Sequence, residues 1–300
     1  MKNIWFKLLI FMTILLLFVL IYKKMNSLKE YEGFIQKEKF VVKYDSKIYD
    51  DFYVEIYDKV NKTKNRLQNE LSIIINLTQA DYDNSRFLDI GSGTGYAVNE
   101  LTELGFDAFG VDKSEAMIEF SEKKYPYARY KLGDVEEPML FEKNTFTHIL
   151  CLYYTIYQFQ DKDYFFRNCY FWLQPGSYLI VHLVEPNKFN MAVPSAKHVL
   201  FGSPKRINDL RNKDSIVDFT HFQYKSSYKN TGVNHLLLTE TFKDIETNNI
   251  RQNEQTIYMD KIQDIISSAV YNGFTLKSKV DLKSSTMDNF QYLYFFERLT

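Results

Sequence analysis

Short apolar segments alternate with helical stretches between residues 86 and 184, and this alternation constrains the fold more than any other feature of the chain. Apolar segments at 86–91, 106–112 and 145–152 each precede a stretch in which apolar side chains recur at helical spacing. Strands that alternate with helices in this way form a parallel sheet that helices cover on both faces. We therefore predict an α/β fold built around such a sheet.

The pattern changes after residue 186, where longer extended segments follow one another without helices between them. Three of these segments read as antiparallel strands joined by polar turns: 217–225, 235–243 and 252–258. A helix and two closing strands come after them. We predict that residues 187–259 form an insertion with a small β-sheet, which covers the site as a lid and precedes the last two strands of the main sheet.

The amino-terminal segment is strongly apolar, because residues 4–22 read IWFKLLIFMTILLLFVLIY. At about 1.5 Å per residue in a helix, this run is about 28 Å long and matches the ~30 Å hydrocarbon core of a bilayer. A cleaved signal peptide and a buried helix of a soluble protein are the alternatives, but two lysines follow the run where a signal peptide has small residues. We therefore expect a transmembrane helix as an anchor over 1–25, a juxtamembrane linker over 26–45 and a folded domain over 46–300.

Charge and cysteine content narrow the function classes. The chain has 37 basic and 38 acidic residues and a net charge of −1. A nucleic-acid-binding protein usually carries a basic excess or a basic stripe, so no nucleic-acid partner is expected. The two cysteines, Cys151 and Cys169, lack the spacing of a zinc cluster, and we expect no metal site.

The strongest local motif is the segment 87–95, which reads FLDIGSGTG. A buried strand runs into a glycine-rich turn and then into a helix, whose first N–H groups are unpaired. Glycine lets the backbone approach a ligand closely, although a tight turn that needs glycine for its conformation alone is the alternative. The spacing G-x-G-x-G differs from the dinucleotide-binding fingerprint G-x-G-x-x-G.

Acidic residues stand at three successive strand ends. Asp89 lies inside the strand before the turn, where it would repel a pyrophosphate and would suit a cationic group, such as the amino group of S-adenosylmethionine. Asp112 ends the second strand and can accept both ribose hydroxyls of a nucleoside. Asp134 follows the third strand, where an acid can accept from an adenine amino group. This arrangement predicts a pocket for a nucleoside cofactor.

Residues 89–95, Asp112, Asp134 and 173–176 are similar, in the same order, to the motifs of class I S-adenosylmethionine-dependent methyltransferases. The resemblance implies a Rossmann-like sheet of seven strands, with the last strand antiparallel and a β insertion before the final pair. It also implies S-adenosylmethionine as the cofactor. The pattern and the resemblance together assign cofactor binding to the following residues: Asp89, Gly91, Ser92, Gly93, Gly95, Asp112, Lys113, Met117, Asp134, Val135 and Leu152.

A closer similarity concerns the segments 56–59, 151–157 and 184–186 and the strand around Glu240. These segments resemble small-molecule N-methyltransferases, including those that act on nucleotide-linked amino sugars. The segment 195–216 has no counterpart in that resemblance, so the acceptor class stays open.

Methyl transfer is an in-line displacement at an activated carbon, so the protein chiefly supplies alignment and desolvation. Tyr57 and Tyr153 can contact the sulfonium region through a hydroxyl or a ring face. Tyr157 follows the fourth strand, where open sheets bind ligands. We expect these three tyrosines to be catalytic, with ordinary packing as the alternative in a chain that has 23 tyrosines.

These features predict an enzyme that transfers a methyl group from S-adenosylmethionine to a small-molecule or lipid-like acceptor, with N-methylation favoured. A non-catalytic scaffold that keeps the fold and an NAD-dependent oxidoreductase are the alternatives. Because S-adenosylmethionine is a cytosolic metabolite, we expect a single-pass membrane protein whose catalytic domain faces the cytosol and whose amino-terminal helix binds the membrane.

Overall fold

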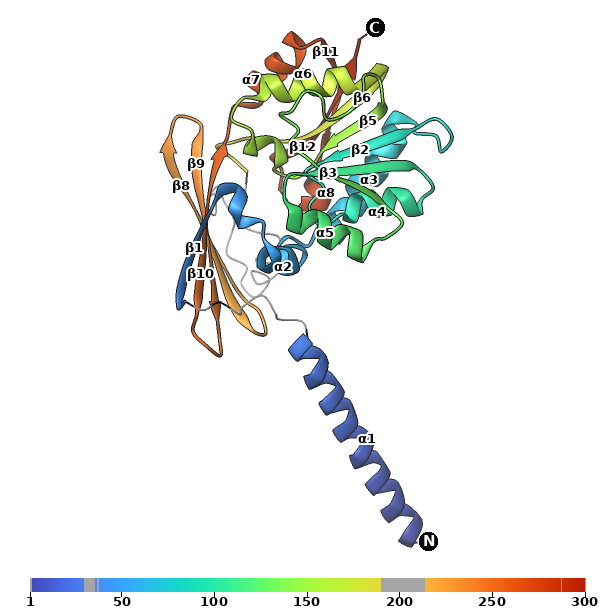
Figure 1. Cartoon of the computed structure of the whole chain (residues 1–300), viewed down its shortest axis with the longest axis vertical. Coiled ribbons are helices and arrows are strands. Elements are labelled where there is room, and N and C mark those ends of the chain that lie inside the picture. Colours follow the sequence, from blue (N-terminus) through green and yellow to red (C-terminus); the bar gives the residue numbers. More distant parts are fainter. Residues whose placement is uncertain (1, 30–35, 37, 190–213, 287, 300) are drawn as a thin grey trace. The chain divides into compact units, whose positions relative to one another are not determined.

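A computed structural model describes residues 2–29, 36, 38–189, 214–286 and 288–299. The chain divides into two compact units, Met1–Lys37 and Glu38–Thr300. The first unit contains the helix α1 (Lys2–Lys29), which is dark blue in Figure 1.

The prediction of a membrane anchor over 1–25 is wrong. Among the described residues, no helix combines the length and the apolar character that crossing a bilayer requires. The prediction of a single-pass membrane protein, bound to a membrane through its amino-terminal helix, is therefore wrong as well. The helix α1 also extends to Lys29, into the stretch expected to be a linker.

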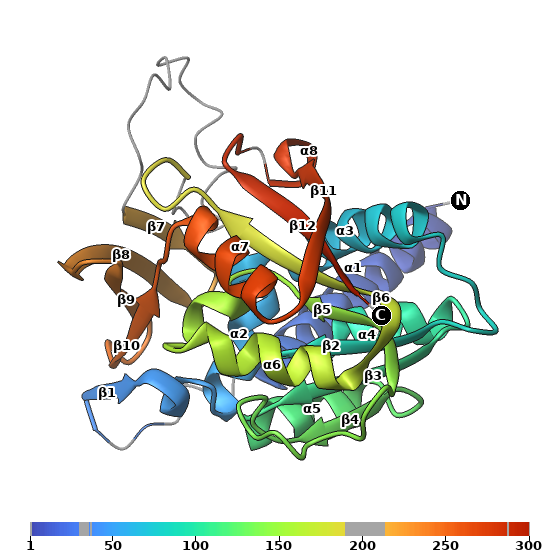
Figure 2. The same cartoon turned by 90° about the horizontal axis from the view of Figure 1, so that it is seen from above.

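The main sheet of the second unit has seven strands in the order β11-β12-β6-β5-β2-β3-β4 (Figure 2). The pairs β2–β3, β3–β4, β2–β5 and β5–β6 are parallel, whereas β12 runs antiparallel to both β6 and β11. The Rossmann-like part of the prediction, a mixed α/β sheet, is therefore confirmed. The strands are β2 (Arg86–Ile90), β3 (Asp107–Asp112), β4 (Arg129–Leu132), β5 (Phe146–Cys151), β6 (Leu173–Val184), β11 (Phe274–Asp281) and β12 (Gln291–Arg298).

Helices cover both faces of this sheet. Alternate side chains of each strand point to opposite faces, so apolar side chains lie on both. Leu88 and Ile149 join a core with α6 and α7, which Figure 2 shows side by side. Their neighbours Phe87 and Leu150 join a second core with α3 and α4. The helices are α2 (Asp51–Asn61), α3 (Thr63–Thr78), α4 (Tyr96–Glu103), α5 (Glu115–Lys124), α6 (Lys162–Trp172), α7 (Ile262–Tyr271) and α8 (Lys283–Thr286), with the short 3-10 helices η2 (Asp45–Ile48) and η3 (Thr155–Gln158).

A second sheet has five strands in the order β1-β10-β9-β8-β7. Four of its strands come from the insertion, between β6 and β11, and are β7 (Asp214–Asp218), β8 (Phe222–Gly232), β9 (His235–Asp244) and β10 (Ile250–Tyr258). The edge strand β1 (Phe40–Tyr44) comes from the stretch expected to be a linker and pairs in parallel with β10. Residues 190–213 of the expected insertion lie outside the described residues.

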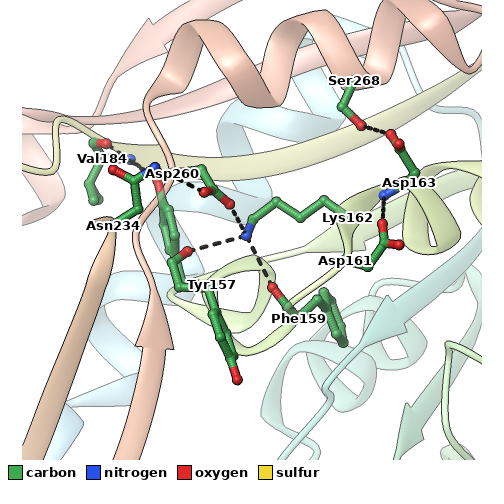
Figure 3. A network of polar contacts seen from close by, with 10 residues as sticks. Tyr157, Phe159, Asp161, Lys162, Asp163, Val184, Asn234, Asp260 and Ser268 are labelled. Atoms are coloured by element: carbon green, nitrogen blue, oxygen red, sulfur yellow. Dashed lines mark hydrogen bonds and ion pairs between the residues drawn. The ribbon is translucent and has the colours of Figure 1, made fainter. Parts of the chain in front are cut away.

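A buried lysine ties the end of β10 to α6 (Figure 3). Lys162 Nζ donates to Asp260 Oδ2 at 2.5 Å, to the carbonyl of Phe159 at 3.1 Å and to that of Tyr258 at 3.2 Å. Asn234, in the turn between β8 and β9, donates to the other oxygen of Asp260 at 3.4 Å. Burial lowers the pKa of Lys162, and the ion pair with Asp260 opposes that shift.

Replacing Lys162 by methionine should lower the free energy of unfolding by about 2 kcal/mol, because two carbonyls and a carboxylate lose their donor. The loss is smaller than for a fully buried pair, since the Asp260 side chain is 31% exposed. Urea denaturation measures it, with the exposed Lys261→Met as a matched control. Equal stability of the two variants would show that this contact does not hold the second sheet in place.

Candidate functional site

The glycine turn follows β2 and adopts a backbone conformation that other residues rarely take. Gly91 has a φ of +68° and Gly93 a φ of +52°. A Cβ atom on Gly91 would lie 2.7 Å from the Thr155 side chain, whereas the nearest atom to a Cβ on Gly93 would be 3.9 Å away. The turn therefore packs tightly against the segment after β5 at Gly91 and has room for a Cβ atom at Gly93.

Asp112 lies at the end of β3 and faces this turn. Its Oδ2 accepts from the Gly93 N–H and its Oδ1 from the Ser114 N–H, both at 2.9 Å. Burial raises the pKa of Asp112, and these two backbone donors oppose the shift. An ionised carboxylate has about four acceptor positions. Asp112 thus keeps acceptor capacity for a ligand hydroxyl group beside these backbone donors.

A cavity, which we call the first cavity, opens above the glycine turn and holds about 600 Å³, open solvent included. Seven of the residues expected to bind the cofactor line it: Gly91, Gly93, Asp112, Lys113, Met117, Asp134 and Val135. Seven further lining residues were not predicted as cofactor ligands: Tyr49, Ile90, Val111, Gly133, Thr155, Gln158 and Phe159. Tyr57, expected to be catalytic, completes the lining.

Four expected cofactor residues lie outside this lining: Asp89, Ser92, Gly95 and Leu152. Gly95 lies where α4 begins, and a Cβ there would come within 2.5 Å of the Tyr130 hydroxyl. Leu152 packs in the core that contains α3 and α4. Gly95 and Leu152 therefore have structural positions, at the start of α4 and in the core, and do not border the first cavity.

Asp89 is buried in β2 beside the first cavity, with 5% of its surface exposed. Burial, and then the nearby Asp112 carboxylate, raise the pKa of Asp89 to about 8, and the Arg66 guanidinium acts in the opposite direction. At neutral pH this acid therefore holds a proton that a bound cation would displace.

We predict that S-adenosylmethionine binds about tenfold more tightly at pH 7 than at pH 6. The bound cation favours the ionised form of Asp89, whose pKa is about 8 in the free protein, so the competing proton weakens binding as pH falls below 8. Calorimetry in buffers of different ionisation enthalpy should show a proton released at pH 7. A variant Asp89→Asn that keeps the same pH dependence would contradict this role.

The three expected catalytic tyrosines occupy different places. Tyr57 lines the first cavity and also a second one, and Tyr153 lines the second cavity alone. Tyr157 lines neither of them and is fully buried in the core. Its hydroxyl accepts from the Val184 N–H at 2.8 Å, so this residue fastens η3 to β6. We leave Tyr157 out of the proposed site.

The second cavity adjoins the first, and four residues line both: Tyr49, Tyr57, Thr155 and Gln158. Its other lining residues come from α2, from the segment after β5 and from the second sheet: Tyr53, Asn61, Tyr153, Tyr154, Tyr224, Tyr228, Leu238, Glu240, Gln255 and Ile257. The second sheet thus forms one side of this cavity, and the ends of the main sheet form the other.

Tyr49 is fixed in the wall between the two cavities. Its carbonyl accepts from Ser114 Oγ at 2.6 Å, and its hydroxyl accepts from Gln158 Nε2 and Gln255 Nε2, both at 3.0 Å. Burial raises the pKa of its phenol above the ordinary value, so the hydroxyl stays protonated. Tyr49 therefore joins α5, η3 and β10 at the point where the cavities meet.

Tyr153 is held by a buried ion pair behind the second cavity. The Arg66 guanidinium lies 4.1 Å from the centre of the Tyr153 ring and forms an ion pair with Glu70 at 3.0 Å. The Tyr153 hydroxyl donates to Asn61 Oδ1 at 3.0 Å, and its backbone has a φ of +55°. These contacts hold Tyr153 in an unfavourable backbone conformation. Residues held in this way are frequent at binding sites.

Residues 88–181 match a methyltransferase domain family. A ubiquinone biosynthesis O-methyltransferase from Bradyrhizobium diazoefficiens is 28% identical over 126 residues, which are 40% of this chain and 49% of that protein. The chain spans no more than about half the length of the curated relatives it matches.

Solved structures of methyltransferases share the fold. An S-adenosylmethionine-dependent methyltransferase from Clostridium acetobutylicum gives a TM-score of 0.63 at 18% identity, over 83% of this chain and 98% of that one. An amino pentose methyltransferase from Micromonospora echinaspora, solved with S-adenosylmethionine bound, gives 0.57 at 18% identity, over 80% of this chain and 96% of that one. At these identities the likeness concerns the fold.

The residues of the first cavity fit S-adenosylmethionine. Asp112 keeps acceptor capacity for a ligand hydroxyl group, Asp134 lies in the lining, and the turn has room at Gly93. The domain match, the strand order and this fit confirm the predicted cofactor. Residues 88–181 therefore form a methyltransferase domain, and the fold is that of the S-adenosylmethionine-dependent methyltransferases.

Proposed function

We propose that this methyltransferase methylates a small molecule bound in the second cavity, with nitrogen as the favoured methylated atom. The observation that carries the proposal is the wall that the two cavities share, formed by Tyr49, Tyr57, Thr155 and Gln158. A methyl group that leaves a cofactor in the first cavity passes between these side chains to an acceptor in the second cavity.

The relatives support methylation of a small molecule but differ in the methylated atom. One structural neighbour is named as an amino pentose methyltransferase and another as a sugar N-methyltransferase. The matched relative from Bradyrhizobium diazoefficiens is named as an O-methyltransferase. O-methylation is therefore the second candidate, and the choice depends on what the second cavity binds.

S-adenosylmethionine supplies, when bound, a methyl group already activated by a sulfonium, so the chain needs no nucleophile of its own. In our proposal Asp112 holds the ribose hydroxyls and Asp134 accepts from the adenine amino group. Tyr49 and Tyr57 exclude water and fix the line along which the acceptor approaches. Because β8, β9 and β10 line the second cavity, the sheet of the insertion acts as the lid that selects the acceptor.

The test is transfer of a tritiated methyl group from S-adenosylmethionine to metabolite, protein and membrane fractions. Label should enter the small-molecule fraction with the wild type and not with Asp112→Ala. Label found in protein alone, or no transfer by a protein that binds the cofactor, would refute the proposal. A calorimetric titration with NAD should give no heat of binding, which tests the oxidoreductase alternative.

A further inference from the structure

A buried carboxylate lies in the wall of the second cavity. Glu240, on β9, lines this cavity, and the residue is 4% exposed. Its neighbours across the sheet are Ser226 on β8 and Asn253 on β10, which are also buried. Burying a carboxylate is unfavourable unless a cation or several donors accompany it.

Hydroxyl donors, and no direct ion pair, compensate this carboxylate among the described residues. The Tyr224 hydroxyl donates to Glu240 Oε1 at 2.8 Å, and no lysine or arginine of the described part of the chain forms an ion pair with it. Arg251, on the neighbouring strand β10, is the nearby cation, and its guanidinium already binds other groups. Its guanidinium binds Asp50 at 2.9 Å and Asn253 Oδ1 at 3.0 Å.

The surroundings of Glu240 raise its affinity for a proton or another cation. Burial raises the pKa of this carboxyl, and the hydroxyl donors of Tyr224 and Tyr53, with the charge of Arg251, oppose the shift. Tyrosines from α2, β8 and the segment after β5 face the same space, and burial keeps their phenols protonated. Glu240 is the one carboxyl group among the described residues that line this cavity.

The rest of the wall is aromatic. Seven tyrosines line the second cavity, and no basic side chain is among its described lining residues. The face of an aromatic ring attracts a cation, most strongly where water is excluded. A wall of tyrosine rings with one carboxylate matches an organic ammonium ion, whereas it offers no charged partner to a carboxylate or a phosphate.

We propose that the acceptor is an organic amine, bound with its nitrogen at Glu240 inside the tyrosine-lined cavity. This inference rests on the proposed function and specifies its substrate class. Glu240 is then both the charge partner that selects the acceptor and the group that receives its proton.

The chemistry balances with these groups alone. The ammonium first gives one proton to the Glu240 carboxylate, which leaves a neutral amine with a lone pair. The lone pair forms the N–C bond while the S–C bond breaks and leaves its electron pair on sulfur. The positive charge moves to nitrogen, beside Glu240, which later releases its proton to solvent.

The test uses tetramethylammonium, a cation that cannot lose a proton, as a probe. Ligand-observed NMR on the protein saturated with S-adenosylhomocysteine should show binding, and Glu240→Gln should weaken it by about tenfold or more. Glu254→Gln is the matched control, because Glu254 lies on β10 next to Asn253 and its side chain points to the opposite face of the sheet. That variant should bind like the wild type.

A neutral probe of similar size, tert-butanol, keeps the test valid if Glu240→Gln does not fold. The wild type should bind tetramethylammonium and not tert-butanol, and equal binding of the two would overturn the inference. Equal binding of tetramethylammonium by wild type and Glu240→Gln, or no binding at all, would overturn it as well. Failure of the wild type to bind S-adenosylhomocysteine would instead refute the proposed function.

Discussion

Replacing Asp112 by alanine should weaken S-adenosylmethionine binding by a factor on the order of 10² to 10⁴. In our proposal the carboxylate accepts from the ribose hydroxyls, and each charge-assisted hydrogen bond contributes about 1.5–3 kcal/mol. The loss is increased because the Gly93 and Ser114 N–H groups also lose the acceptor that holds the glycine turn. Isothermal titration calorimetry measures the change.

The matched control is Asp107→Ala, at the other end of the same strand. Asp107 is part exposed and forms an ion pair with Arg86 at 3.0 Å. It begins β3, whereas Asp112, which binds the glycine turn, ends this strand. This variant should keep wild-type affinity. If Asp112→Ala folds, as thermal denaturation would show, and binds the cofactor as tightly as the control, the pocket has been assigned to the wrong residues.

Replacing Arg66 by methionine should lower the free energy of unfolding by about 3–5 kcal/mol. Arg66 and Glu70 form a buried ion pair, with side chains 8% and 0% exposed, and removing one partner leaves a buried charge without compensation. Burial already raises the pKa of Glu70, and Arg66 is the group that opposes this shift. The substitution also removes the guanidinium from the face of the Tyr153 ring.

The double variant Arg66→Met with Glu70→Leu separates the ion pair from the packing. Because replacing a whole buried pair by apolar groups is often nearly neutral, it should regain most of the lost stability. Urea denaturation of the wild type and both variants gives the three values. A double variant as unstable as Arg66→Met would show that the buried pair is not the cause.

The cofactor side of the site could be predicted from the sequence because its parts are local. A glycine turn after a buried strand, and an acid at the end of the next one, lie at the same edge of a parallel sheet whatever the rest of the chain does. Asp112, Asp134 and Gly93 accordingly line one cavity. Thr155 lies in the segment 151–157, which the sequence had already indicated, and Gln158 follows that segment directly in the same turn of helix.

The acceptor side could not be predicted because its parts come together only in the folded chain. Tyr49 meets Gln255, which is 206 residues away in the sequence, and β1 pairs with β10 over a similar separation. No periodicity of a five-residue segment indicates a distant partner strand. Local patterning does not show either where α2 ends: Lys62 adopts a left-handed conformation that separates α2, which carries Tyr57, from α3.

A crystal structure with S-adenosylhomocysteine bound tests the central claim most directly, namely that cofactor and acceptor occupy two cavities with a common wall. The ribose hydroxyls should bind Asp112, and the sulfur should face the wall formed by Tyr49, Tyr57, Thr155 and Gln158. A nucleoside bound elsewhere, or a sulfur directed away from the second cavity, would contradict the account.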